Sequence, residues 1–204
     1  VQRGAKVSLA ARSEERLHEV EKLISEQSSA NALVTAGDVT NAKDVQLMVE
    51  KTLEKWGRID VLVNNAGFGV RGPFDQMPLD LFRKNFETNF FAPIVCCQAV
   101  IPHLRKQGGG LIVNVESIVS LRSMPFVSCY SATKHALHAL SEAMRLELVP
   151  DRIHVLSVCP GLIDSEFQQN RVDVGVMDER APRWLYMPAD RCAAKIVNAM
   201  ERGR

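Results

Sequence analysis

A tyrosine and a lysine stand four residues apart in a segment with helical periodicity. Tyr130 and Lys134 are therefore expected on one face of a helix, one turn apart. A free tyrosine ionises at about pH 10, and an ammonium within about 4 to 6 Å favours the phenolate. We expect Lys134 to lower the pKa of Tyr130 by about a unit or more. Such a phenol could serve as general acid or general base near neutral pH.

The elements that must position this pair alternate along the chain. Short runs rich in Val, Ile and Leu predict strands at residues 6–11, 32–36, 59–64, 111–115 and 153–159, the third of them buried on both faces. Amphipathic segments predict helices after Ser13, from Thr40 or Asn41 to Gly57, and at about residues 79–104, 130–148 and 188–200. This order predicts a single α/β domain over residues 1–204 with a doubly wound parallel sheet. Functional residues are then expected at the carboxyl ends of the strands.

Composition excludes several classes of protein. The 204 residues are 46% hydrophobic and 24% charged, with a net charge of +1. Those values argue against a disordered chain and against binding driven by basic charge, so we expect no nucleic-acid partner. No apolar run reaches the roughly 18 residues of a membrane helix. The five cysteines are odd in number and form no C-x-x-C pair. They are expected as buried free thiols in a reducing compartment, which favours a cytoplasmic location.

Two patterns point to sites that we do not expect. The segment Gly67-Phe68-Gly69-Val70-Arg71-Gly72 matches the dinucleotide pattern G-x-G-x-x-G, but Pro73 follows it and no acidic residue lies at the required spacing. We interpret it as a turning loop. His135 and His138 are three residues apart rather than four, with no acidic or cysteine ligand at metal spacing in the sequence, so no metal site is predicted.

Several further motifs occur in a characteristic order. Asn64-Asn65-Ala66-Gly67 ends the third predicted strand, and Pro160-Gly161 follows the fifth. Together with Asp38-Val39, Asn89, Ser117 and Tyr130-x-x-x-Lys134, the chain resembles the short-chain dehydrogenase/reductase family over essentially its whole length. The resemblance implies a Rossmann-like fold. It also implies that the family's first strand with its glycine-rich loop, and its last strand, lie outside this chain, so we expect a domain truncated at both ends.

The resemblance implies a role for each catalytic candidate. Ser117 would donate a hydrogen bond to the substrate carbonyl oxygen, where negative charge develops. Tyr130 would transfer the proton, and Lys134 would also bind the nicotinamide ribose hydroxyls. Asn89 would hold a water in a proton relay to the lysine. Glu116 stands where many members have a serine, and we expect it to alter the local charge without stopping catalysis.

The predicted cofactor is NADP(H). A member that prefers NAD has an acidic residue at the position of Ala11, whereas here Arg12 follows and can bind a 2′-phosphate, with Ser13 adding a hydroxyl. The resemblance further implies contacts with the cofactor from four more residues. These are Asp38 and Val39 at the adenine, the backbone of Asn65 near the adenosine ribose, and the backbone of Ile163 at the nicotinamide amide.

These features predict an oxidoreductase that transfers a hydride between NADP(H) and a carbonyl or secondary alcohol. Apolar residues of the segment 162–187 suggest a hydrophobic small-molecule substrate; they are Phe167, Val172, Val174, Val176, Met177, Trp184, Leu185 and Tyr186. A 3-oxoacyl-[acyl-carrier-protein] reductase remains an alternative within the family. A catalytically inactive nucleotide-binding sensor of the same fold and an inert fragment are the others. The resemblance implies a homodimer or homotetramer.

Overall fold

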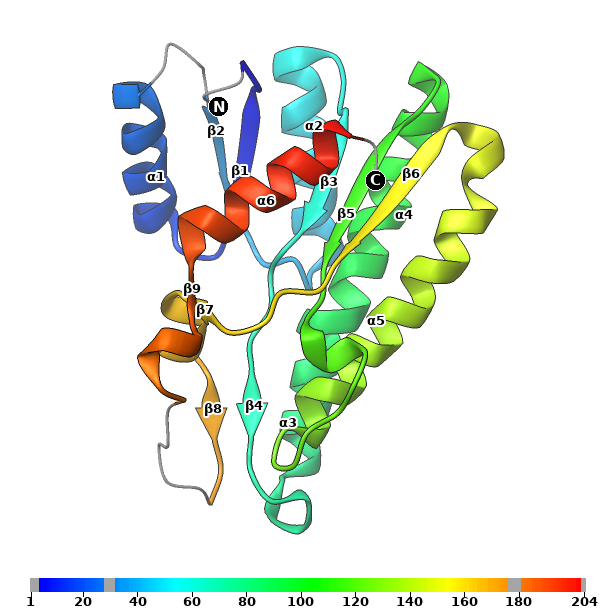
Figure 1. Ribbon diagram of the computed structural model, residues 1–204. Coiled ribbons are helices and arrows are strands. Elements are labelled where there is room, and N and C mark those ends of the chain that lie inside the picture. The colour runs from blue at the N-terminus through cyan, green and yellow to red at the C-terminus, as the bar shows by residue number, and fades with distance from the viewer. Residues whose placement is uncertain (1–3, 28–31, 176–180, 203–204) are drawn as a thin grey trace.

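The strands form parallel sheets, as the sequence predicts. The computed structural model describes residues 4–27, 32–175 and 181–202. Two strands, β1 (Val7–Ala11) and β2 (Ala32–Ala36), pair in parallel. A second sheet has the order β3-β5-β6, all parallel, from β3 (Val61–Asn64), β5 (Gly110–Val115) and β6 (Ile153–Val158). Figure 1 shows helices lying along these strands, which confirms the α/β class.

The helices begin and end close to the positions that the sequence indicates. They are α1 (Glu14–Gln27), α2 (Ala42–Trp56), α3 (Leu79–Phe86), α4 (Ala92–Gln107), α5 (Ser128–Glu147) and α6 (Ala189–Glu201). The Asn41 side chain accepts a hydrogen bond from the backbone N–H of Lys43 and so caps α2. Gly57 ends that helix with φ 74°, a left-handed conformation that glycine adopts without strain.

The helix predicted at residues 79–104 is interrupted. A π-helical turn, η2 (Glu87–Phe91), separates α3 from α4. Two buried asparagines, Asn85 and Asn89, both donate to the carbonyl of Phe68, at 2.9 and 3.0 Å. The widened turn brings both amides to the same backbone group of the loop after β3. Periodicity did not predict it, because a single π turn leaves the pattern of apolar residues almost unchanged.

Strand β3 is not buried on both faces, which corrects the expectation for residues 59–64. Leu62 packs against the main core and Asn64 is buried, whereas Val61 and Val63 point to the other face and are 38% and 47% exposed. Among the described strands, β3 pairs with β5 and not with β1. Its apolar composition is that of a central strand, but here it lies at an edge.

The glycine-containing segment after β3 is a loop, as interpreted. Its residues enter the short strand β4 (Val70–Arg71) and then the 3₁₀ turn η1 (Phe74–Gln76), not a helix. Strand β4 pairs with β8 (Val172–Asp173), and β7 (Ile163–Asp164) pairs with β9 (Met187–Pro188). The sequence did not predict these short pairs. In Figure 1 the β4–β8 pair lies in the lower part of the molecule, and the β7–β9 pair lies above it, at the start of α6.

The core lies between the three-stranded sheet and its covering helices. Leu104 and Ile112 are fully buried there, and Ile153 is 2% exposed. Every cysteine is a free thiol, as predicted, but only Cys97 and Cys129 are buried; the other three, which were also expected to be buried, are half-buried. In the part of the chain that the structure describes, no helix has the length and apolar character needed to cross a membrane.

A chain of buried amides ties the sheet to α5. Asn64 Nδ2 on β3 donates to Asn114 Oδ1 on β5 at 2.8 Å, and Asn114 Nδ2 donates to Ser141 Oγ on α5 at 2.8 Å. The hydroxyl of Ser141 donates in turn to the carbonyl of Leu137 at 2.7 Å. Because buried polar groups without partners are costly, these contacts fix both the strand register and the position of α5.

Replacing the central amide tests this arrangement. Asn114→Leu keeps the number of side-chain heavy atoms but removes the acceptor for Asn64 Nδ2 and the donor to Ser141 Oγ. We expect the free energy of unfolding in urea to fall by about 1 to 3 kcal/mol. Gln46→Ala, which removes an exposed hydrogen bond on α2, should change it by less than about 0.5 kcal/mol. Equal effects of the two substitutions would contradict the structural role given to the amide chain.

Candidate active site

The predicted catalytic side chains meet where β5 ends. Ser117 lies two residues after that strand, and Tyr130 and Lys134 lie on the first turns of α5. Lys134 is only 4% exposed, and its Nζ donates to the carbonyl of Val115 at 2.8 Å. The same Nζ lies 5.9 Å from the centre of the Tyr130 ring. The structure therefore brings the sequence-predicted pair together at the carboxyl edge of the sheet.

The pKa of Tyr130 departs from the expectation. Desolvation raises the pKa of Tyr130 to about 12, and a hydrogen bond from Ser117 offsets only part of this rise. The prediction of a lowered pKa is therefore wrong for this structure, because burial of the phenol has the largest effect on its pKa. Tyr130 holds its proton throughout the physiological range, which suits a group that donates a proton.

Lys134 is shifted in the opposite sense. Burial lowers the pKa of Lys134 to about 8, since desolvation disfavours the ammonium form. The nearby Glu116 carboxylate, and to a smaller extent Cys159, act against this fall. The charge of Lys134 is thus sensitive to pH close to neutrality, and it depends on groups beyond the predicted catalytic set.

Ser117 is fixed by a short turn that follows the strand. It is the N-cap of the 3₁₀ turn η3 (Ile118–Ser120) in a capping box, in which Ser120 Oγ accepts from the Ser117 N–H at 3.1 Å. Its own hydroxyl accepts only a long contact of 3.4 Å from the Val119 N–H. The hydroxyl proton therefore remains available for donation to Tyr130 or to a substrate oxygen.

Asn89 lies in the π turn and braces the loop after β3. Its Oδ1 accepts from the N–H of Phe68 at 3.0 Å, and its Nδ2 donates to the carbonyl of Phe68 and to Thr133 Oγ1. The side chain is thus committed to protein partners. In a regular helix, the N–H of residue 93 would donate to the carbonyl of Asn89. Residue 93 is a proline, which has no N–H. The water-holding role of Asn89 stays a prediction, and the main-chain carbonyl of Asn89 would be the group that holds the water.

A glycine lets the loop after β3 pack closely against the π turn. A Cβ on Gly67 would lie 2.9 Å from Asn89 Oδ1, too close for an undisturbed contact, whereas its 3.8 Å from Lys134 Nζ would be an ordinary contact. A larger residue there would displace the Asn89 side chain. The glycine that ends the Asn-Asn-Ala-Gly motif is therefore required by the close approach of Asn89, whose Oδ1 accepts a hydrogen bond from this loop.

The structure also gathers a cluster that sequence analysis missed. Glu116 is 3% exposed, and its Oε2 accepts from His138 Nδ1 at 2.6 Å and from the Cys159 thiol at 3.4 Å. The ligand-type atoms of these three residues lie within 4.8 Å of one another. His138 has no acidic or cysteine ligand at metal spacing in the sequence, but the fold places one of each beside it. The three residues come from the ends of β5 and β6 and from α5, so no local spacing connects them.

The residues predicted to hold a cofactor lie at the ends of neighbouring strands. Arg12 and Ser13 are exposed directly after β1, and Asp38 and Val39 are half-buried after β2. Hydrogen bonds from Thr40 lower the pKa of Asp38, and the charge of Arg12 contributes to this lowering, so the two groups are neighbours.

The other two predicted cofactor contacts lie farther along the same edge. Asn65 is exposed at the end of β3, and Ile163 begins β7. The predicted cofactor contacts thus lie on the carboxyl side of the parallel strands; they are Arg12, Ser13, Asp38, Val39, Asn65 and Ile163. Their contacts with a cofactor remain predictions.

Apolar side chains lie beside the phenol. The ring centroid of Phe167 is 5.7 Å from that of Tyr130, at a tilt of 52°. Trp184 is 80% exposed, while Val176 and Met177 of the predicted lining lie outside the described residues. The segment between Ser117 and Tyr130, which sequence analysis did not single out, exposes four large apolar residues: Ile118, Leu121, Met124 and Phe126. The four large apolar residues within nine positions, just before the helix that carries Tyr130, were the available signal.

Comparison with known proteins places the chain in a family. Residues 1–174 match the profile of the family described as short chain dehydrogenase. The chain is 40% identical over 134 residues to 3-ketodihydrosphingosine reductase of Bacteroides thetaiotaomicron, covering 66% of this chain and 50% of that protein. It is 34% identical over 211 residues to 11-beta-hydroxysteroid dehydrogenase 1A of Arabidopsis thaliana, covering 98% of this chain and 60% of that protein.

A solved structure agrees with the fold. An alcohol dehydrogenase from the archaeon Thermococcus sibiricus, complexed with 5-hydroxy-NADP, superimposes with a TM-score of 0.86 at 26% identity. The match covers 98% of this chain and 81% of that one. The chain thus spans about half to two thirds of the curated relatives named above. With the profile match over most of its length, the chain belongs to the short-chain dehydrogenase/reductase family of oxidoreductases.

Proposed function

We propose that this protein is an NADP(H)-dependent reductase of a hydrophobic ketone or aldehyde, able to run the reverse reaction on a secondary alcohol. The observation that carries the proposal is the grouping of Ser117, Tyr130 and Lys134 at the end of β5, with the ammonium of Lys134 buried beside the phenol. The curated relatives named above are longer than this chain, so the activity is proposed for the whole protein.

The chain's own residues would act on the carbonyl oxygen. Ser117 donates a hydrogen bond to this oxygen, where negative charge develops in the transition state. Tyr130, whose pKa is raised to about 12, keeps its proton until that oxygen becomes strongly basic, and then donates it. The ammonium of Lys134 stabilises the phenolate that remains. At neutral pH the phenol carries the proton that the reductive direction requires.

A bound nicotinamide cofactor would supply the hydride to the carbonyl carbon. The residues present fit such a group, since Arg12 is exposed after β1 beside Asp38, and Gly67 keeps the loop after β3 free of a side chain near Lys134. A guanidinium can bind a phosphate in a bidentate manner. With Ala11 in place of an acidic residue, this supports NADP(H) over NAD(H).

The surroundings of Tyr130 support a hydrophobic substrate. Phe167 packs against the phenol, and Phe126 and Met124 are each 51% exposed on the segment that leads to it. The names of two relatives refer to a ketosphingoid base and to a hydroxysteroid. We therefore propose a bulky, apolar ketone rather than a small polar one.

Removing the phenol hydroxyl tests the proton donor. Tyr130→Phe in the full-length protein should lower turnover at saturating NADPH by at least about 100-fold, the scale of general acid catalysis. The affinity for NADPH, measured by fluorescence titration, should change little. Turnover close to that of the unaltered protein would refute the role given to Tyr130. Retained NADPH binding without turnover of any carbonyl by the unaltered protein would instead identify a nucleotide sensor.

Removing the guanidinium tests the cofactor preference. Arg12→Ala should weaken NADPH binding by about 10- to 100-fold, the value of a charge-assisted hydrogen bond, and leave NADH binding almost unchanged. Arg58→Ala, which removes an exposed arginine after α2, serves as a matched control. An equal loss of affinity for both cofactors in Arg12→Ala would mean that Arg12 does not contact the 2′-phosphate.

A further inference from the structure

A buried carboxylate without an assigned task lies next to the catalytic lysine. Glu116 follows Val115, whose carbonyl accepts the hydrogen bond from Lys134. The Glu116 side chain is fully inaccessible to solvent. Its Oε1 has no hydrogen-bond partner among the described residues. A fully buried carboxylate is costly unless it is paired, so its position requires compensation from a positive or hydrogen-donating group.

That compensation comes from helix α5 in two ways. His138 stands one turn after Lys134, and its Nδ1 lies 2.6 Å from Glu116 Oε2. The His138 side chain is 24% exposed, so it joins the buried carboxylate to the surface. The ammonium of Lys134 interacts electrostatically with the same carboxylate. Two groups on the same helix, at positions 134 and 138, thus hold Glu116 between them.

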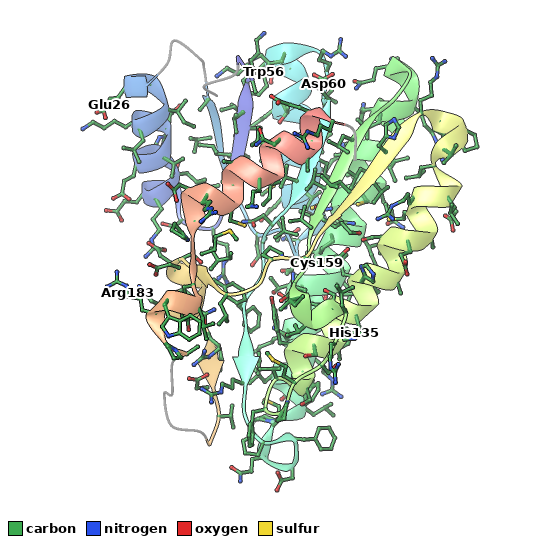
Figure 2. The ribbon with its side chains drawn as sticks, viewed as in Figure 1. Glu26, Trp56, Asp60, His135, Cys159 and Arg183 are labelled. Carbon is green, nitrogen blue, oxygen red and sulfur yellow. The ribbon has the colours of Figure 1, made fainter. Side chains whose placement is uncertain are left out.

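The remaining groups around Lys134 add little opposing charge. Among the described residues, Tyr130 on α5 is a neutral phenol, and burial beside Glu116 raises the pKa of Cys159 at the end of β6 to about 11. On the side of the π turn, Asn89 is uncharged. Glu116 is therefore the formal negative charge that faces the ammonium. Figure 2 shows Cys159 where the chain leaves β6, in the middle of the molecule.

We propose that Glu116, held in place by His138, is a positioning residue that keeps Lys134 in its ammonium form while Tyr130 donates its proton. The inference rests on the proposed reductase function. Lys134 is the group whose ammonium lies beside the reacting phenol, 5.9 Å from its ring centre, and Glu116 acts through it. Desolvation alone would favour the uncharged amine of a buried lysine, and a neutral amine could not stabilise the phenolate that forms.

The spacing of Glu116, His138 and Cys159 would also suit a metal ion. Two features argue for a hydrogen-bonded cluster instead. The contact of 2.6 Å between Nδ1 and Oε2 already joins two of the three groups by a hydrogen bond. The neighbouring ammonium of Lys134 would repel a divalent cation.

The pH profile of ketone reduction tests the inference. Burial with Glu116 opposite gives Lys134 a pKa of about 8, so reduction at saturating NADPH should fall as the pH rises past about 8. This fall in activity is the alkaline limb of the pH profile. Glu116→Gln keeps the shape of the side chain and removes its charge. Because the ammonium of Lys134 loses its counter-charge in the variant, the alkaline limb should move to lower pH by about one unit or more.

Variants at His138 provide a second measurement on a partly exposed side chain. His138→Leu removes the hydrogen bond that holds the carboxylate of Glu116 in place, so the carboxylate stabilises the ammonium of Lys134 less well and the limb should again move to lower pH. His138→Asn places an amide N–H close to the position of Nδ1 and should keep the limb near that of the unaltered protein. His135→Gln is the matched control, since His135 contacts the Ser131 carbonyl on the same helix and not Glu116.

The possible outcomes are distinguishable. An unmoved limb in Glu116→Gln, or a uniform loss of activity at every pH, would overturn the inference while leaving the reductase function intact. If Glu116→Gln does not fold, an unmoved limb in His138→Leu would overturn it equally. Activity that is lost with EDTA and restored by Zn²⁺ would show a metal site instead. An unaltered protein that reduces no carbonyl would overturn the proposed function and, with it, this inference.

Discussion

The ammonium of Lys134 is buried against the last carbonyl of β5, and the arrangement of the site follows from that contact. A charged group in such a position must find partners, and it finds the Val115 carbonyl at 2.8 Å and the nearby charge of Glu116. The contact fixes the start of α5 against the end of the sheet. It thereby sets where Tyr130 lies relative to Ser117, so that the same interaction serves packing and chemistry.

The supporting structure keeps this contact in place through polar groups inside an apolar core. Asn64, Asn114 and Ser141 connect β3, β5 and α5 away from the site. Asn89 performs a similar task for the loop after β3, which approaches Lys134 closely at Gly67. Because hydrogen bonds are directional, these buried amides fix positions that apolar packing alone would leave less well defined.

The electrostatic character of the site favours donation of a proton. Burial raises the pKa of Tyr130 and lowers that of Lys134, so each group is pushed towards its neutral form. A phenol that holds its proton is a suitable acid for reduction, provided that the neighbouring lysine stays charged when the phenolate appears. Glu116 is placed to supply that condition, and His138 links it to the surface.

Much of the fold, and the grouping of Tyr130 with Lys134, could be predicted from the sequence. The strands, the helix ends at Asn41 and Gly57, and the pairing of Tyr130 with Lys134 depend on local periodicity, capping residues and a spacing of four, all of which are properties of neighbouring residues. The π turn at Glu87–Phe91 could not be predicted in this way, since it is defined by contacts of Asn85 and Asn89 with a distant loop.

The tertiary structure alone decided the charges within the site. A pKa depends on all the groups that surround a side chain, whichever element they come from, and so the expected fall in the pKa of Tyr130 became a rise once the phenol was buried. For the same reason, Glu116, His138 and Cys159 were brought together from three elements that no sequence spacing connects. The sequence determined which groups are present, and the packing of α5 on the sheet determined which of them lie together and how Tyr130 and Lys134 ionise.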